Sequence, residues 1–292
     1  SALQALAALA TIAPSRLSPE SRISHDVFRI AKQREVDWLR PDVRALTRVR
    51  PFNHFAGLHV EFPTLMAREG VIAYRTEADY RYALQLQGAF AGVLDTAILR
   101  MRQGIATDVV ESRLTVGNMI TQIDAILTEP LDRSPFYAAV LDFPPTVPES
   151  ARPALRAAYA TTIRETVWPA YRRLRAFLAD EYLPAARDSV GLSAMKGGAA
   201  LYRQMIERET TERLDPEDVH RLGLGEVARI QREMAGVQAE LGFSGPLREF
   251  FDRMRTDPRF HPKSREELAD GFAAIARAVA DAFGVGFVSV EV

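Results

Sequence analysis

Residues 215–243 read DPEDVHRLGLGEVARIQREMAGVQAELGF, and this stretch predicts the fold class of the chain. Asp215 and Pro216 are residue types preferred as the cap and the first position of a helix. Apolar residues then recur in steps of three and four, the period of a helix, as far as Leu241. Gly242 follows as a stop signal. At about 1.5 Å per residue the helix would be roughly 40 Å long, so other helices are expected to pack against it.

The helical period recurs over most of the remaining chain. Helices are expected over residues 18–41, 76–104, 114–127, 151–187, 202–213 and 264–283. Trp168-Pro169 interrupts the longest of these helices. Because proline lacks a backbone N–H, a kink or a break is expected there. These patterns predict an all-α fold, with several long helices arranged around residues 215–241.

The last residues of the chain have a different pattern. Residues 288–292, VSVEV, alternate apolar and polar side chains, which is the period of a β-strand. A lone strand leaves its backbone groups unpaired, and the rest of the chain offers no convincing partner strand. The prediction is therefore a helical domain over residues 1–284 and a strand stub over residues 285–292. The stub would pair with a missing C-terminal part of the same protein.

Composition excludes several classes of protein. The 292 residues carry a net charge of −1, so there is no overall basic surface for nucleic acid. The chain has no cysteine, which excludes disulfides and thiolate metal sites. No run of about 18 apolar residues predicts a transmembrane segment. The Ala-rich start lacks the basic region of an intact signal peptide, and the compartment stays open.

Gly223 and Gly225 formally fit the dinucleotide-binding pattern G-x-G-x-x-A. That motif requires a strand before its first glycine, whereas the preceding DPEDVHRL has a helical pattern. The two glycines are therefore interpreted as allowing close approach of another helix.

His220 lies on the margin of the apolar stripe. It is either a half-buried structural histidine or a substrate contact that titrates near neutral pH.

His54, His59 and Glu61 form the cluster of potential metal ligands in the sequence. Histidines five residues apart lie about 140° apart on a helix, whereas a zinc-binding helix uses a spacing of four. A loop would leave the geometry open, but packing of the neighbouring phenylalanines explains the segment more economically.

Tyr202 is a further candidate substrate contact, because Gly197-Gly198 before it would let a ligand approach the backbone closely. The alternative for Tyr202 is a place in the core.

Several segments, in order along nearly the whole chain, resemble a bacterial family, domain of unknown function 885. They are ADYRYALQL (78–86), RQGI (102–105), SPFY (134–137), WPAYRRLRAFLADEYLPAAR (168–187), GGAALY (197–202) and DPEDVHRLGLGEVARI (215–230). The resemblance implies a largely helical protein related to gluzincin-type zinc metallopeptidases. Members of the family are typically much longer than this chain and are often exported to the periplasm or lipid-anchored.

In the family, the zinc chemistry lies in the C-terminal half, on a helix of H-E-x-x-P-G-H-H type with a downstream acidic ligand. No histidine of this chain is followed by glutamate, so the chain alone is expected to hold no metal and to be inactive. The resemblance implies the non-catalytic N-terminal half of a zinc-dependent peptidase, forming one wall of the substrate cleft. Tyr202, His220, His54 and His59 are its candidate contacts with a peptide substrate. The alternative is a non-catalytic helical binding or scaffold module.

Overall fold

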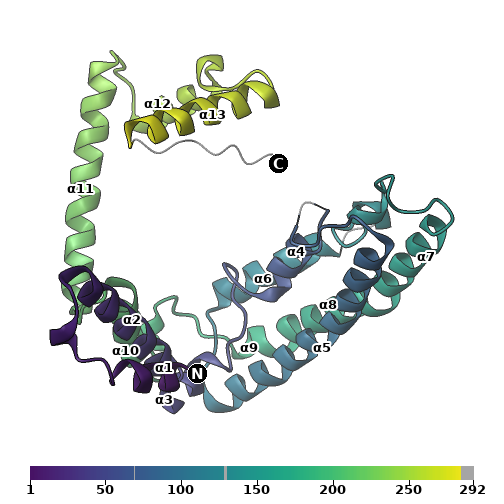
Figure 1. Cartoon of the computed structure of the whole chain (residues 1–292), viewed down its shortest axis with the longest axis horizontal. Coiled ribbons are helices and arrows are strands. Elements are labelled where there is room, and N and C mark those ends of the chain that lie inside the picture. Colours follow the sequence, from purple (N-terminus) through teal and green to yellow (C-terminus); the bar gives the residue numbers. More distant parts are fainter. Residues whose placement is uncertain (69, 128–129, 284–292) are drawn as a thin grey trace. The chain divides into compact units, whose positions relative to one another are not determined.

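The computed structural model describes residues 1–68, 70–127 and 130–283, and all regular elements in these ranges are helical (Figure 1). The predicted all-α fold is thus confirmed for this part of the chain. The expected strand over residues 285–292 lies outside the described residues, so the boundary after residue 284 stays a prediction. Contacts between elements divide the chain into a first unit, Ser1–Leu214, and a second unit that begins at Asp215.

The first unit is built on one long helix, α5. Its helices are α1 (Ala2–Leu9), α2 (Pro19–Trp38), α3 (Pro41–Thr47), α4 (Leu58–Leu65), α5 (Glu77–Thr107), α6 (Arg113–Ile126), α7 (Arg152–Thr162), α8 (Trp168–Phe177), α9 (Leu183–Ala185) and α10 (Gly198–Thr210). α5 and α8 run along each other (Figure 1). Leu94 and Met101 of α5 belong with Tyr171 and Leu174 of α8 to the main core cluster, and all four are fully buried.

Helix α5 begins with the capping box that its sequence predicts. The Thr76 hydroxyl accepts a hydrogen bond from the Asp79 N–H at 3.3 Å, and the Asp79 carboxylate accepts one from the Thr76 N–H at 2.7 Å. The helix continues past Gly104, its expected end, and stops at Asp108, which has a left-handed φ of 58°. A Cβ on Gly104 would lie 2.7 Å from the Val109 carbonyl oxygen. Glycine there lets the chain leaving the helix pass close to it.

The stretch from α7 to α9 stays helical through both of its internal prolines. A π-helical turn, η4 (Ile163–Val167), directly precedes α8, whose second residue is Pro169. A second π-helical turn, η5 (Leu178–Tyr182), precedes α9 and Pro184 in the same way. Proline removes one hydrogen bond and crowds the preceding turn, and a wider turn accommodates both effects. The interruption expected at Trp168-Pro169 therefore takes the form of a π turn within a continuous helix.

The second unit contains α11 (Pro216–Glu240), α12 (Leu247–Thr256) and α13 (Arg265–Ala282). α11 begins as its sequence predicts: Asp215 is the cap and accepts a hydrogen bond from the Glu217 N–H at 2.9 Å. Gly242 follows the helix with a left-handed φ of 68°. The Ser264 hydroxyl likewise accepts from the Glu267 N–H at 3.1 Å at the start of α13. Both helices are specified by local signals.

The apolar stripe of α11 does not form a core in the described part of the chain. Leu222 is 64% exposed and Val237 is 50% exposed. Apart from their chain neighbours and the adjacent backbone of α11 itself, no atom lies within 4 Å of where a Cβ on Gly223 or Gly225 would be. Within the second unit, the close approach of another helix expected at these glycines is therefore not seen among the described residues. The expectation that α11 organises the helices of the whole chain stays a prediction. The core of the first unit forms around α5, because that helix is buried against the helical stretch of α7, η4 and α8 along most of its length.

Candidate functional site

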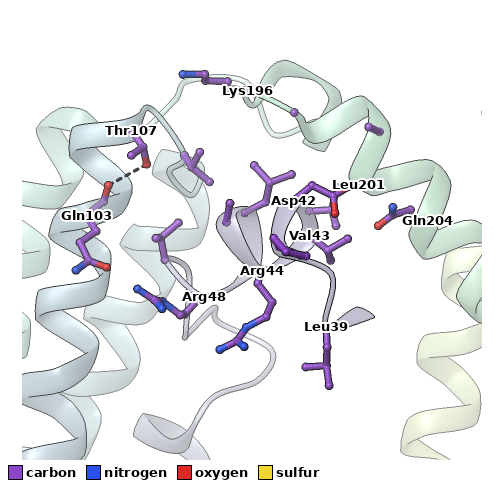
Figure 2. A pocket seen from close by; sticks show the side chains of 17 residues that line it. Leu39, Asp42, Val43, Arg44, Arg48, Gln103, Thr107, Lys196, Leu201 and Gln204 are labelled. Atoms are coloured by element: carbon purple, nitrogen blue, oxygen red, sulfur yellow. Dashed lines mark hydrogen bonds between the residues drawn. The ribbon is translucent and has the colours of Figure 1, made fainter. Parts of the chain in front are cut away.

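An open groove of about 960 Å³ lies between α3, the C-terminal end of α5 and the N-terminal turn of α10, all within the first unit (Figure 2). Its floor is apolar. Val43 of α3, Val49 and Val109 after α3 and α5, and Leu201 of α10 are buried there as one small cluster. Pro41 at the first position of α3 fixes where that helix begins. The groove has the size of a ligand site.

The edges of the groove carry an excess of positive charge. Arg44 and Arg48 project on the same side in Figure 2, and Lys196 comes from the loop before α10 at the opposite edge. Within the described residues, none of these three side chains forms an ion pair or a hydrogen bond. Asp42 is the acidic side chain of the lining, and Arg40 neutralises it at 3.0 Å.

Two glycines bring the start of α10 against α3 and the preceding loop. Gly197, the cap of α10, has a left-handed φ of 73°, and a Cβ there would lie 3.0 Å from the Leu46 side chain. A Cβ on Gly198 would lie 1.8 Å from the Leu192 carbonyl oxygen. A side chain at Gly198 would require a shift of the backbone, and one at Gly197 would require a strained φ and a shift of the Leu46 side chain. Gly197-Gly198 thus permits close approach of the chain to itself, and Gly197 lines the groove.

The structure does not place Tyr202 or His220 in this groove. Tyr202 is 41% exposed on α10, one residue after Leu201, and is absent from the lining. Neighbouring residues of a helix point about 100° apart, which separates the two side chains. His220 lies on α11, in the second unit, and is exposed. Their roles as substrate contacts stay predictions.

His59 lies in the core, at the start of α4. Its side chain is fully buried and stacks on Phe52 with ring centroids 4.8 Å apart. The Tyr171 hydroxyl donates a hydrogen bond to the His59 backbone oxygen at 2.8 Å. Neither ring nitrogen has a hydrogen-bond partner among the described residues. Burial lowers the pKa of His59 from 6.5 to about 4, although Glu61 opposes this shift. The ring is therefore neutral at pH 7.

His54 is half-buried near a nearly buried ion pair that the sequence patterns do not reveal. Its backbone oxygen accepts a hydrogen bond from Gln122 at 2.8 Å, and its Nδ1 is buried without a partner among the described residues. Close by, Arg50 pairs with Glu111 at 3.2 Å. Burial raises the pKa of Glu111, and the charges of Arg50, Arg187 and His54 oppose the shift. These groups come from distant parts of the sequence, so no local motif could have identified them.

The side chains of the described residues set the chemistry of the site. No three histidine, aspartate or glutamate side chains among them are placed to hold a metal ion. The groove is lined by apolar groups, cations, one neutralised carboxylate and the neutral polar side chains of Gln103, Thr107 and Gln204. Its charged and apolar groups can bind a ligand. Among the described ranges, every helix is too short or too polar to cross a membrane.

Comparisons with known proteins agree on a family and a fold. The family described as "Bacterial protein of unknown function (DUF885)" matches residues 1–288. Among solved structures, the chain is similar to "The crystal structure of the putative lipoprotein from Colwellia psychrerythraea", with a TM-score of 0.67 and 21% sequence identity. The match covers 80% of this chain and 41% of that chain, so it spans less than half of the longer protein. No curated protein matches.

Proposed function

Because the chain belongs to the bacterial DUF885 family, we propose that it is the helical, non-catalytic part of a longer, zinc-dependent peptidase-like protein. Its groove would form one wall of the substrate cleft. The groove between α3, α5 and α10 carries this proposal, since it combines an apolar floor with unpaired charged side chains at its edges. Such a surface can bind and orient an extended chain.

Comparison with the longer protein supports the proposal that this chain is one part of a longer protein. The structurally similar "putative lipoprotein" is more than twice as long as the region that this chain matches. A zinc ion in the complete protein would activate water for attack on a peptide carbonyl. The described residues of this chain do not fit such an ion, so no catalytic step is assigned to them. The similar protein's description as a lipoprotein supports an exported, lipid-anchored location as part of the same proposal.

Exposed apolar faces in the second unit also support a further partner surface. Large apolar side chains are more than half exposed along α11 and α13: Leu222, Leu224, Val227, Phe272, Ile275 and Val279. Large exposed apolar side chains in such number are typical of an interaction site. In the proposed assembly, these faces pack against the rest of the longer protein.

The test compares the chain with the product of its complete gene. The complete product should contain one zinc ion per chain and cleave peptides, whereas the 292-residue chain should bind peptides without cleaving them. Zinc is measured by atomic spectroscopy, and cleavage by mass spectrometry of a mixed peptide pool. A stop codon directly after Val292, or a complete product free of zinc, would overturn the proposal. It would favour the alternative, a helical binding or scaffold module, which the apolar floor and charged edges of the groove also suit.

A further inference from the structure

The groove leaves cations unpaired at a place where helices meet. Elsewhere in the first unit, arginines at the contact of two helical segments are neutralised across it: Arg102 with Glu181 and Arg175 with Asp124, both at 2.6 Å, and Arg173 with Asp95 at 2.8 Å. Where α3, α5 and α10 meet, Arg44, Arg48 and Lys196 have no such partner among the described residues. The groove therefore carries positive charge that its own acidic side chain, Asp42, does not neutralise, because Asp42 pairs with Arg40.

The remaining lining adds two features that suit an anion with an apolar body. Gly197 caps α10 without a side chain, so the first N–H groups of that helix receive no side-chain acceptor. The positive end of the helix dipole thus adds to the charge of the cations. Val43 and Leu201, each 2% exposed, provide an apolar floor between the charged edges. Figure 2 shows Arg44 and Arg48 on one side of this floor and Lys196 on the other.

We propose that the groove selects peptides that carry a carboxylate, with an adjacent apolar side chain resting on the floor. Arg44 and Arg48 would bind the carboxylate, since guanidinium groups match its two oxygens. Lys196 would attract the same ligand from the opposite edge. The carboxylate can belong to an acidic side chain or to the C-terminus of the peptide. This inference rests on the proposed function, because it names the class of peptide that the substrate wall would accept.

The strength of binding follows from the exposure of the cations. Arg44, Arg48 and Lys196 are exposed, and an exposed ion pair contributes little when water and salt screen it. Removing one charge from either partner should weaken binding about fivefold, the factor for an ion pair of about 1 kcal/mol. Removing both arginines should weaken it by at least about tenfold. Because the charges are exposed, affinity should also fall as salt is raised.

The experiment measures binding of four labelled peptides to the 292-residue chain by fluorescence anisotropy. All four peptides share one apolar residue. They combine either glutamate or glutamine beside that residue with either a free or an amidated C-terminus. We expect the peptide with both carboxylates to bind best and the neutral one worst. Affinity is lost when glutamate is replaced by glutamine and when the C-terminus is amidated, and the larger of these two losses identifies which carboxylate is bound. Equal affinities for all four peptides, or no binding by any of them, would overturn the proposal.

Variants locate the effect in the groove. Arg44→Gln and Arg48→Gln, singly and together, should reduce the preference for acidic peptides, and Arg48→Glu should favour a lysine version of the peptide. The matched control is Arg203→Gln, because Arg203 is exposed on α10 but lines none of the described pockets. Circular dichroism checks that each variant is folded. An equal loss in the Arg203→Gln variant refutes the assignment. Zinc content and cleavage by the complete gene product test the proposed function separately, so the two can fail independently.

Discussion

Replacing His59 with leucine should remove much of the acid sensitivity of the first unit. The imidazole is fully buried, stacks on Phe52 and has no hydrogen-bond partner for either ring nitrogen among the described residues. Burial lowers its pKa from 6.5 to about 4 in the folded protein. Between these two values, the unfolded chain binds a proton that the folded chain does not bind. The free energy of unfolding therefore falls as the pH is lowered through this interval.

The size of the effect follows from the width of that interval. At about 1.36 kcal/mol per pH unit, the shift of the His59 pKa corresponds to about 3 kcal/mol. This stabilisation is present above pH 6.5 and is lost as the pH falls towards about 4. Leucine has a similar volume and no titrating group. Between pH 7 and pH 4, the free energy of unfolding of the His59→Leu variant should therefore fall by about 3 kcal/mol less than that of the wild type.

Urea unfolding followed by tryptophan fluorescence measures this difference. Both tryptophans of the chain, Trp38 and Trp168, lie in the first unit, so their emission reports on that unit. The control is His220→Leu, the same change at an exposed position of the second unit, which should leave the fluorescence transition unchanged at both pH values. Parallel loss of stability in the wild type and His59→Leu would refute the reasoning. That result would mean that water or a rearrangement satisfies the buried ring.

Three further substitutions test the packing around the groove and the core. Tyr171→Phe removes the hydroxyl that donates to the His59 backbone oxygen at 2.8 Å, and should lower the free energy of unfolding by about 1–3 kcal/mol in urea titrations. Glu111→Ala leaves its nearly buried arginine partner without a countercharge and should cost about 3–5 kcal/mol; loss below about 1 kcal/mol would mean that the arginine finds water. Gly198→Ala places a Cβ 1.8 Å from a carbonyl oxygen and should lower the melting temperature and weaken peptide binding. Its matched control, Gly225→Ala, meets no atom within 4 Å inside α11 and should stabilise that helix by about 1 kcal/mol. Equal effects of the two alanine variants in calorimetry would contradict the geometry.

Local signals predicted the helices well because the interactions that begin and end a helix span only a few residues. Asp215, Ser264 and the Thr76–Asp79 box all act as caps in the structure, as their sequence context indicates. The prediction that Gly104 ends α5 was wrong. Its role depends on the approach of Val109 to the helix, and that contact is a consequence of how the chain turns back.

The candidate site was much harder to predict. Periodicity identified the apolar stripe of α11, but it could not show that the stripe stays exposed in the described structure. The spacing of apolar residues indicates which face of a helix is apolar and gives no information on what packs against that face. His59 and Tyr202 were proposed from their neighbours in sequence. Tertiary contacts bury the first completely and leave the second outside the groove. No sequence motif identifies Arg44 or Arg48 as part of a site.

The sequence by itself determined the all-α class, most helix positions and the family, because these depend on period, caps and the order of short motifs. Only the tertiary structure decided which polar groups are isolated from water and which are gathered at one edge. Arg50 and Glu111 become a nearly buried pair, and Arg44 and Lys196 become opposite edges of one groove. Such charges act through their separation and burial, and both quantities exist only once distant segments have packed together.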